Sequence, residues 1–178
     1  MVEPQTPQAN LATMKAALGA MARKDIPACL DLLTPDFKIN LAGMPYQQTG
    51  HAAWEGNARQ IIDAFPDFEI RIDDMFAAGD KVAVRARMSG THKGPFLGAP
   101  ATGKRVSYDS YELYRLEGGK VAEEWICSDL VTLMTQIGAI SPHQLVLLWL
   151  GSFRLWFVAA TGVAAGAGLV LLLQALLP

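Results

Sequence analysis

Glu112, Glu124 and His92 are the side chains whose types and positions best suit proton transfer. The two glutamates lie in neighbouring segments, "SYELYR" and "VAEEW", where polar and apolar residues alternate. Two carboxyl groups that share a partly apolar pocket repel each other, and this raises one pKa into the range useful for acid/base catalysis. The alternative is that one glutamate lies at a rim in water, or pairs with a Lys or Arg.

His92 lies in "GTHKGPFLGAPATGK", a loop rich in Gly and Pro between two predicted strands. Loops held by a rigid scaffold often carry function, and an imidazole there could shuttle protons. The alternative is that His92 fixes the turn through hydrogen bonds. The histidines lie far apart in the sequence without the spacing of metal ligands, so we predict no metal. No phosphate-binding loop, dinucleotide fingerprint or nucleophile elbow is present, and we predict no cofactor.

The alternation assigns the residues of three predicted strands to two faces of a sheet. One face is expected to be concave and covered by N-terminal helices; it carries Val82, Val84, Ala86, Met88, Tyr108, Ser110, Glu112, Tyr114, Ala122, Glu124 and Ile126. With Trp54 from a helix, the members predicted to line a ligand pocket are Tyr108, Tyr114, Ile126 and Met88. A slip of one residue in strand register would move both glutamates to the outside.

The opposite face mixes charges of both signs with aromatic side chains. It carries Arg85, Arg87, Asp109, Tyr111, Leu113, Arg115, Val121, Glu123, Trp125 and Cys127. Such a face suits cross-strand ion pairs, and we expect it to be exposed or to form a homodimer.

Helical spacing comes before strand alternation along the chain. Helices are predicted over 11–23, from 26 to the proline at 35, over 51–65 and over 130–140, with strands over 37–43, 68–80, 81–94, 105–120 and 120–129. This order predicts an α+β domain with a cone-shaped, curved, mostly antiparallel sheet packed on N-terminal helices. We expect a disordered lead at 1–9, the α+β domain at 10–140, an interfacial linker or helix at 141–154 and a transmembrane helix at 155–177.

Composition and charge exclude some classes of protein. The chain has 178 residues and a net charge of −2, which offers no electrostatic footprint for nucleic acid. Cys29 and Cys127 are too few for a disulfide framework, and we expect both to be reduced core residues. Residues 1–9 lack the pattern of a secretory signal.

The segment "LWFVAATGVAAGAGLVLLL", residues 155–173, contains no charged residue. As a helix with about 1.5 Å rise per residue it would be roughly 28 Å long, close to the hydrocarbon thickness of a bilayer. The segment therefore predicts a single-pass protein of the bacterial inner membrane. Because Arg154 lies on its N-terminal side, we expect the N-terminal domain in the cytoplasm.

Small residues in this segment suggest a packing face for another transmembrane helix. Gly162 and Gly166 form a GxxxG pair, and Ala160, Ala164 and Gly168 form a second row. Small residues let helix backbones approach closely in lipid. The alternative is that Gly and Ala are simply common in membrane helices.

Residues 11–140 resemble the SnoaL-like polyketide cyclase, or ester cyclase, family. The similarity rests on "AFPDFE", "GDKVAVR", "GTHKGPFLGAPATGK", "YRLEGGKVAEEW" and Asp129, seven residues before "QIG". The resemblance implies the cone-shaped α+β barrel of ketosteroid isomerases, scytalone dehydratase and nuclear transport factor 2. It also implies a cofactor-free intramolecular aldol condensation that closes a polyketide ring.

The resemblance carries over unevenly to single residues. Aligned on "QIG", the aspartate that acts as acid/base in those cyclases falls on Ile126, and neighbouring family histidines fall on Glu124 and Glu112. His92 and Asp129 match scaffold positions. Glu124 could replace the missing aspartate, because it shares a strand face with Ile126.

Two hypotheses about function follow. The first is a membrane-anchored, non-catalytic or degenerate accessory or binding subunit of a bacterial membrane complex, such as a photosynthetic or respiratory one. The second is a membrane-tethered, cofactor-independent cyclase or isomerase that acts on a lipophilic carbonyl compound, polyketide- or quinone-like, through Glu124, Glu112 and His92.

Overall fold

The structure, a computed structural model, describes residues 6–152 and 154–176. The chain divides after Ala139 into two compact units, and each has its own internal organisation.

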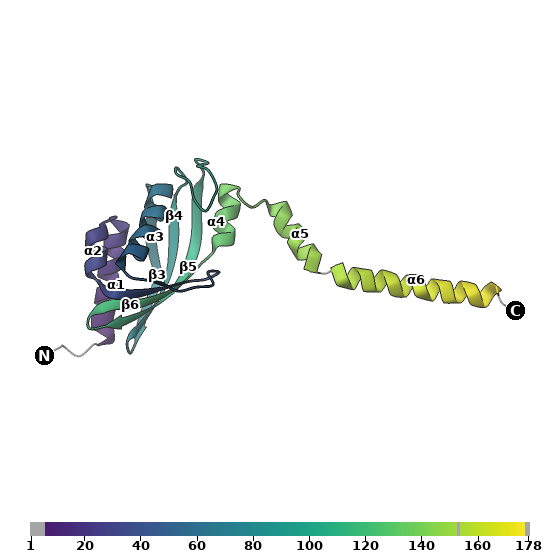
Figure 1. Cartoon of the computed structure of the whole chain (residues 1–178), viewed down its shortest axis with the longest axis horizontal. Coiled ribbons are helices and arrows are strands. Elements are labelled where there is room, and N and C mark those ends of the chain that lie inside the picture. The colour runs from purple at the N-terminus through teal and green to yellow at the C-terminus, as the bar shows by residue number, and fades with distance from the viewer. Residues whose placement is uncertain (1–5, 153, 177–178) are drawn as a thin grey trace. The chain divides into compact units, whose positions relative to one another are not determined.

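Apart from the short strand β2 (Gln48–Thr49), which was not predicted, the helices and strands of the first unit follow the order predicted from the sequence (Figure 1). Its described helices are α1 (Pro7–Ala22), α2 (Ile26–Asp31), α3 (His51–Ala64) and α4 (Leu130–Ile137). Its described strands are β1 (Leu33–Leu41), β2 (Gln48–Thr49), β3 (Glu69–Ala78), β4 (Lys81–Thr91), β5 (Arg105–Glu117) and β6 (Lys120–Ser128).

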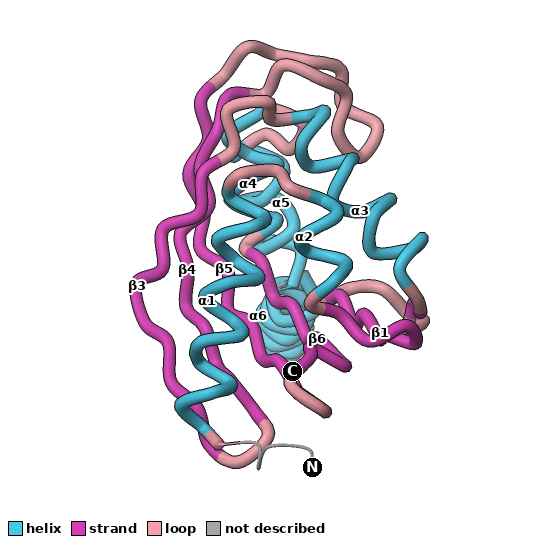
Figure 2. Tube along the Cα trace, turned by 90° about the vertical axis from the view of Figure 1, so that its left-hand side faces the viewer, coloured by secondary structure: helices cyan, strands magenta, loops and turns pink. Residues whose placement is uncertain are grey.

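The strands form one mixed sheet in the order β2-β1-β6-β5-β4-β3. Strands β3 to β6 form antiparallel pairs, whereas β1 runs parallel to β6. Figure 2 shows α1, α2 and α3 on one side of this curved sheet. The predicted α+β class, with a curved sheet packed on helices, is therefore confirmed.

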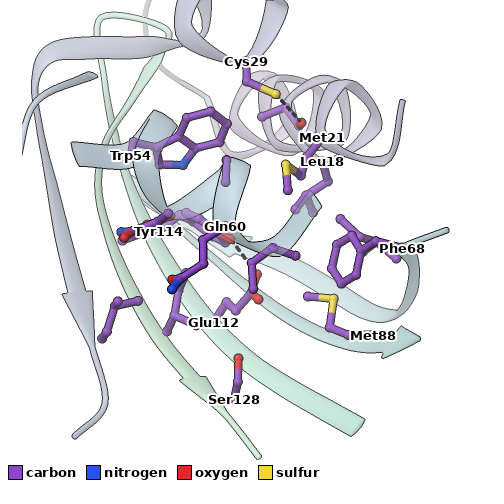
Figure 3. A pocket seen from close by; sticks show the side chains of 18 of the residues that line it. Leu18, Met21, Cys29, Trp54, Gln60, Phe68, Met88, Glu112, Tyr114 and Ser128 are labelled. Atoms are coloured by element: carbon purple, nitrogen blue, oxygen red, sulfur yellow. Dashed lines mark hydrogen bonds between the residues drawn. The ribbon is translucent and has the colours of Figure 1, made fainter. Parts of the chain in front are cut away.

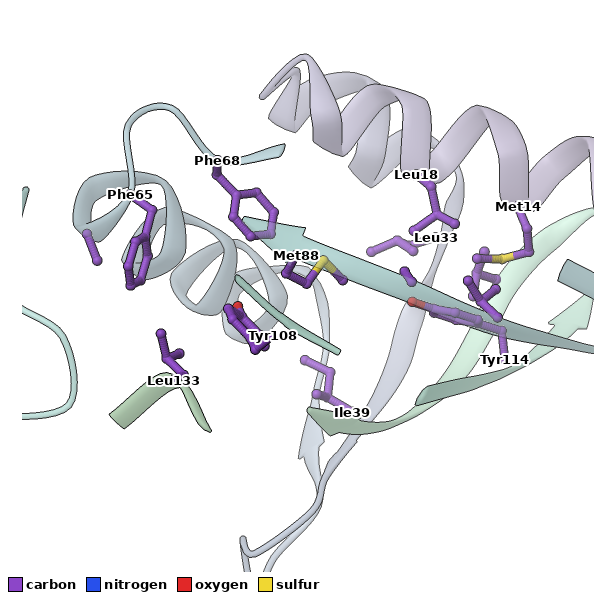
Figure 4. Packing of buried hydrophobic residues seen from close by; sticks show 14 of the residues in the cluster. Met14, Leu18, Leu33, Ile39, Phe65, Phe68, Met88, Tyr108, Tyr114 and Leu133 are labelled. Atoms are coloured by element: carbon purple, nitrogen blue, oxygen red, sulfur yellow. The ribbon is translucent and has the colours of Figure 1, made fainter. Parts of the chain in front are cut away.

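Alternation along β4 and β5 buries every second side chain from Val82 and Val106 onward. These side chains meet α1 and α3 in an apolar core, where Figure 4 shows Met14 and Leu18 of α1 above Met88 and Tyr114 of the sheet. The helices thus cover the concave face that the sequence pattern predicts.

Strand β6 departs from simple alternation. Leu116 pairs with Val121, but Arg115 pairs with Glu123, so the strand register shifts by one residue at Ala122. The shift places Val121 on the concave side, where it is 1% exposed, although alternation predicted it on the outer face. A bulge of this kind inserts an extra residue into one strand and re-aims the side chains that follow.

The outer face carries the ion pairs expected from the sequence. Arg87 pairs with Asp109 at 2.9 Å, and Arg115 with Glu123 at 3.4 Å. Cys127 is exposed on this face, so the expectation that both cysteines are core residues is wrong for Cys127 and right for the buried Cys29. The homodimer expected through this face stays a prediction.

The second unit contains α5 (Pro142–Ser152) and α6 (Arg154–Leu176), with Ile140 and Ser141 before them. The predicted packing residues Ala160, Gly162, Ala164, Gly166 and Gly168 lie in α6 and are exposed. Within the described residues, no helix offers an apolar stretch of the length that crossing a bilayer requires, so the transmembrane helix predicted at 155–177 is not supported.

The β4–β5 loop is tied to the end of α3. The backbone N–H groups of Lys93 and Gly94 donate to the carbonyl of Ala64, at 2.9 and 3.1 Å. The contact at Gly94 is so close that a Cβ there would collide with the backbone of Asp63. Phe96, farther along the loop, reaches the apolar core from this anchor.

We predict that Gly94→Ala lowers the free energy of unfolding by about 1–3 kcal/mol, the usual cost of overpacking. The collision is with backbone atoms of α3, which cannot move aside as a flexible side chain can. Urea denaturation followed by fluorescence measures the effect.

Gly56→Ala is the matched control, because a Cβ at this helical position meets no atom within 4 Å. Alanine has the higher helix propensity, so this variant should gain up to about 1 kcal/mol. Equal stability of Gly94→Ala and the unchanged protein would contradict the proposed anchor.

Candidate active site

A cavity of about 290 Å³ lies between the concave face of the sheet and helices α1, α2 and α3. Most of its lining is apolar. Figure 3 shows Leu18 and Met21 of α1, and Trp54 and Gln60 of α3, facing Glu112 and Ser128 of the sheet across this space. A largely apolar pocket with a few polar groups is the usual form of a small-molecule site.

Glu112 of β5 is 7% exposed and is held by two hydroxyl donors. Ser110 donates to its Oε1 at 2.7 Å, and Tyr114 donates to its Oε2 at 2.5 Å. Ser110 Oγ also lies 3.0 Å from Ser128 Oγ on β6. Alternation along β5 brings these groups together, because Ser110, Glu112 and Tyr114 project from the same face of one strand.

Glu124 of β6 is 5% exposed and lines the same cavity. Its backbone carbonyl accepts a hydrogen bond from Asn40 Nδ2 at 2.9 Å, which fixes the strand at this point. Among the described residues, no donor forms a hydrogen bond with its carboxyl group. The carboxyl oxygens are not among the fully enclosed side-chain atoms that lack a partner, so they border the open space of the cavity.

The two carboxyl groups are close enough to influence each other. Glu124 pairs with Tyr114 and Glu112 with Ile126, so the glutamates are diagonal neighbours on adjacent strands. Side chains in this relation lie roughly 7 Å apart. The sequence interpretation that both face one pocket agrees with this geometry.

Burial raises the pKa of both glutamates, but the two environments differ. For Glu124 burial raises the pKa well above its usual range, and the charge of Glu112 raises it further. For Glu112 burial also raises the pKa, while hydrogen bonds from Tyr114 and Ser110 oppose the rise. A hydrogen bond to the ionised form stabilises it, so ionisation is less unfavourable at Glu112 than at Glu124.

The predicted pocket residues Met88, Tyr108, Tyr114, Ile126 and Trp54 all line this cavity. Ile126 stands where the family resemblance places an acid, so an apolar side chain occupies that position of the wall. Burial raises the pKa of the Tyr108 phenol, which therefore stays protonated.

His92 is fully buried but is not among the residues that line the cavity. Its Nδ1 lies 3.0 Å from Thr102 Oγ1, and its ring stacks on Phe65 with centroids 5.4 Å apart. Its backbone N–H donates to the backbone carbonyl of Lys104 at 2.9 Å. These contacts favour the alternative in which His92 fixes the loop. His92 does not share the cavity that Glu112 and Glu124 line.

Several polar residues of the cavity were not singled out from the sequence, notably Ser128, Asn57 and Gln60. Ser128 continues the two-residue alternation from Glu124, so the pattern could have found it. Asn57 is three residues after Trp54 and therefore shares its helix face. Gln60 belongs to the next turn, but its polarity alone gives no signal of a cavity.

Among the described residues, no group of three or more His, Cys, Asp or Glu side chains could hold a metal ion. The expectations of no metal and no cofactor stay predictions.

A curved sheet under helices, with a carboxyl pair in the cavity between them, defines a cone-shaped α+β fold. The family described as SnoaL-like polyketide cyclase matches residues 12–137. The chain therefore belongs to this family, as the sequence resemblance indicated. No curated protein matches the chain in sequence.

Solved structures agree with this assignment. The chain is 26% identical to AclR, a putative hydroxylase from Streptomyces galilaeus, with a TM-score of 0.69 over 76% of this chain and 99% of that one. It is 25% identical to a putative SnoaL-like polyketide cyclase from a Jannaschia species, with a TM-score of 0.71 over 78% and 99%. It is 29% identical to IdmH, a putative polyketide cyclase from Streptomyces antibioticus, with a TM-score of 0.64 over 72% and 98%.

We predict that Glu124→Gln becomes progressively more stable than the unchanged protein as the pH rises above about 4.5, the ordinary pKa of a glutamate. The native state keeps the Glu124 proton to higher pH than the unfolded chain does, because its pKa is raised. Between the two pKa values the native state binds more protons, so its stability falls with rising pH. Glutamine does not titrate and removes this loss.

The difference in free energy of unfolding between variant and unchanged protein is measured by urea denaturation at each pH. Glu123→Gln is the matched control, because Glu123 is the adjacent residue but pairs with Arg115 on the outer face. A difference for Glu124→Gln that is constant across this pH range would contradict the prediction.

Proposed function

We propose that this protein is a cofactor-independent acid/base enzyme that enolises a lipophilic carbonyl compound in the cavity. The observation that carries the proposal is the pair of buried carboxyl groups in unlike environments, one held by two hydroxyl donors and one without a donor. Pairs of titratable groups whose surroundings separate their pKa values are typical of acid/base sites. Membership of the cyclase family supports the same class of reaction.

Glu112 is assigned the role of base and Glu124 the role of acid. Ser110 and Tyr114 stabilise the ionised form of Glu112, so this carboxylate accepts a proton from the carbon next to the substrate carbonyl. Glu124 keeps its proton and donates it to the carbonyl oxygen. The C–H electron pair forms the C=C bond of the enol, the carbonyl π pair forms the new O–H bond with the Glu124 proton, and the reverse transfers return both protons.

The apolar lining suits a lipophilic substrate, polyketide- or quinone-like, and the enol is the nucleophile that an aldol ring closure requires. The putative polyketide cyclase IdmH, to which the chain is similar, lends support to such a ring closure. His92 has no part in this mechanism, because it does not line the cavity. A non-catalytic accessory role and membrane anchoring find no support among the comparisons or the described helices.

We predict that the protein accelerates exchange of the α-protons of 2-tetralone, an apolar ketone, for deuterium in D₂O. The exchange needs only the enolisation step and is followed by proton NMR. Glu124→Gln and Glu112→Gln should each slow the catalysed exchange by roughly 10²–10⁴-fold, the usual contribution of a positioned acid or base.

Glu123→Gln again serves as the control and should exchange at the rate of the unchanged protein. If the unchanged protein exchanges no faster than buffer, or if neither cavity variant slows it, the proposed function is wrong.

We predict that Tyr114→Phe shifts the pH–rate profile of the same exchange. Phenylalanine keeps the ring but removes the hydrogen bond to Glu112 Oε2, which stabilises the carboxylate. The pKa of Glu112 should rise, so the pH below which exchange declines should move upward. Tyr108→Phe removes a phenol with no hydrogen bond to Glu112 among the described residues and should leave that pH in place.

A further inference from the structure

The charges inside the cavity are all of one sign. Among the described residues that line it, Glu112 and Glu124 are the groups able to carry a charge at neutral pH, and none is Lys, Arg or His. The other titratable groups beside them are Tyr108 and Tyr114 of β5 and Cys29 of α2. Burial raises the pKa of the Cys29 thiol to about 11 and those of both phenols as well, so all three stay neutral.

The carboxyl group of Glu124 borders the cavity and has no hydrogen-bond donor among the described residues. It is 5% exposed, it faces the cavity, and no described residue donates a hydrogen bond to it. An isolated buried carboxylate is strongly unfavourable, whereas one paired with a cation and hydrogen-bonded is tolerated. The site therefore lacks a cationic donor, and the described residues provide none.

The aromatic lining adds a second feature that favours a cation. Trp54 of α3 and Tyr108 and Tyr114 of β5 border the same cavity as Glu124. Aromatic faces attract cations through their quadrupoles, and the attraction is strongest where water is excluded. The rest of the lining is mostly apolar and suits a hydrocarbon body.

We propose that the cavity binds apolar amines as their ammonium ions, with Glu124 as the counter-ion. The inference concerns the site of the proposed function but requires no reaction to take place there. An ammonium group has the N–H donors that Glu124 lacks, while the body of the ligand lies against α1 and α3. Anionic compounds are disfavoured, because ionised Glu112 repels them and no Lys, Arg or His among the described lining residues attracts them.

Binding is linked to the release of a proton. Burial raises the pKa of Glu124 and so favours its protonated form; pairing with an ammonium ion then requires the O–H proton to leave to solvent, while the ligand keeps its own. Affinity should therefore rise with pH until the ligand amine itself begins to lose its proton. A neutral ligand of the same shape has no such dependence, because Glu124 then keeps its proton.

The test uses 2-naphthylmethylamine and 2-naphthylmethanol. The two probes share the naphthylmethyl body, but the amine carries a positive charge near neutral pH and the alcohol is neutral. Isothermal titration calorimetry near neutral pH, in two buffers of different ionisation enthalpy, gives affinity and proton release together. We expect the amine to bind at least about 10-fold more tightly than the alcohol, with release of a proton. Glu124→Gln should remove the preference and the proton release but keep the affinity for the alcohol.

Glu123→Gln, altered on the outer face, should bind both probes as the unchanged protein does, and circular dichroism checks that each variant is folded. Equal affinity for amine and alcohol, absence of binding by the amine, or an amine preference that survives Glu124→Gln would each overturn the proposal. Amine binding without 2-tetralone exchange would overturn the proposed reaction only. Exchange without amine preference would overturn this inference only.

Discussion

A carboxyl group inside an apolar cavity must keep its proton or gain a partner, and this constraint governs the interior of the fold. Ionising an unpaired buried carboxyl costs several kcal/mol or more, which no single contact in a small domain offsets. Glu112 meets the constraint with two hydroxyl donors, so its charge is tolerated. Glu124 has no such donors among the described residues and therefore keeps its proton when the cavity is empty. The two glutamates differ because Ser110 and Tyr114, which flank Glu112 on the same face of β5, both donate hydrogen bonds to it.

The bulge at Ala122 makes this arrangement compatible with a packed core. Strict alternation cannot place Val121 and Glu124 on the same side of β6, because three positions separate them. The register shift next to Leu116 allows both to face inward, so Val121 completes the apolar core while Glu124 reaches the cavity. Glu123 is then directed outward to Arg115, and Asn40 holds the strand through the Glu124 carbonyl.

Much of this could be predicted from the sequence, for a definite reason. Two-residue alternation along β5 is uninterrupted, so it placed Glu112 and Tyr114 on the concave face without any knowledge of their partners. Alternation assigned Val121 to the wrong face of the sheet. The bulge there depends on how β6 pairs with Leu116 of β5, and this pairing cannot be read from the sequence of β6 alone. The short strand β2 and the parallel pairing of β1 with β6 are long-range features of the same kind. Hydropathy alone predicted a membrane span at 155–177, which the described helices do not support.

Ile126 indicates that membership of the family does not fix the position of the acidic residue on β6. In the family resemblance this position carries the acid/base aspartate, and here it contributes an apolar side chain to the cavity wall. Glu124 lies two residues earlier on the same strand and therefore on the same face, displaced along the strand by roughly 7 Å. A displacement of that size moves the acid relative to any bound carbonyl, so a substrate must sit differently here from one that meets an acid at position 126. Burial and the charge of Glu112 raise the pKa of Glu124, as an acid requires. The sheet face is thus retained, while the proposed mechanism changes both the acid that acts from it and the place where that acid acts.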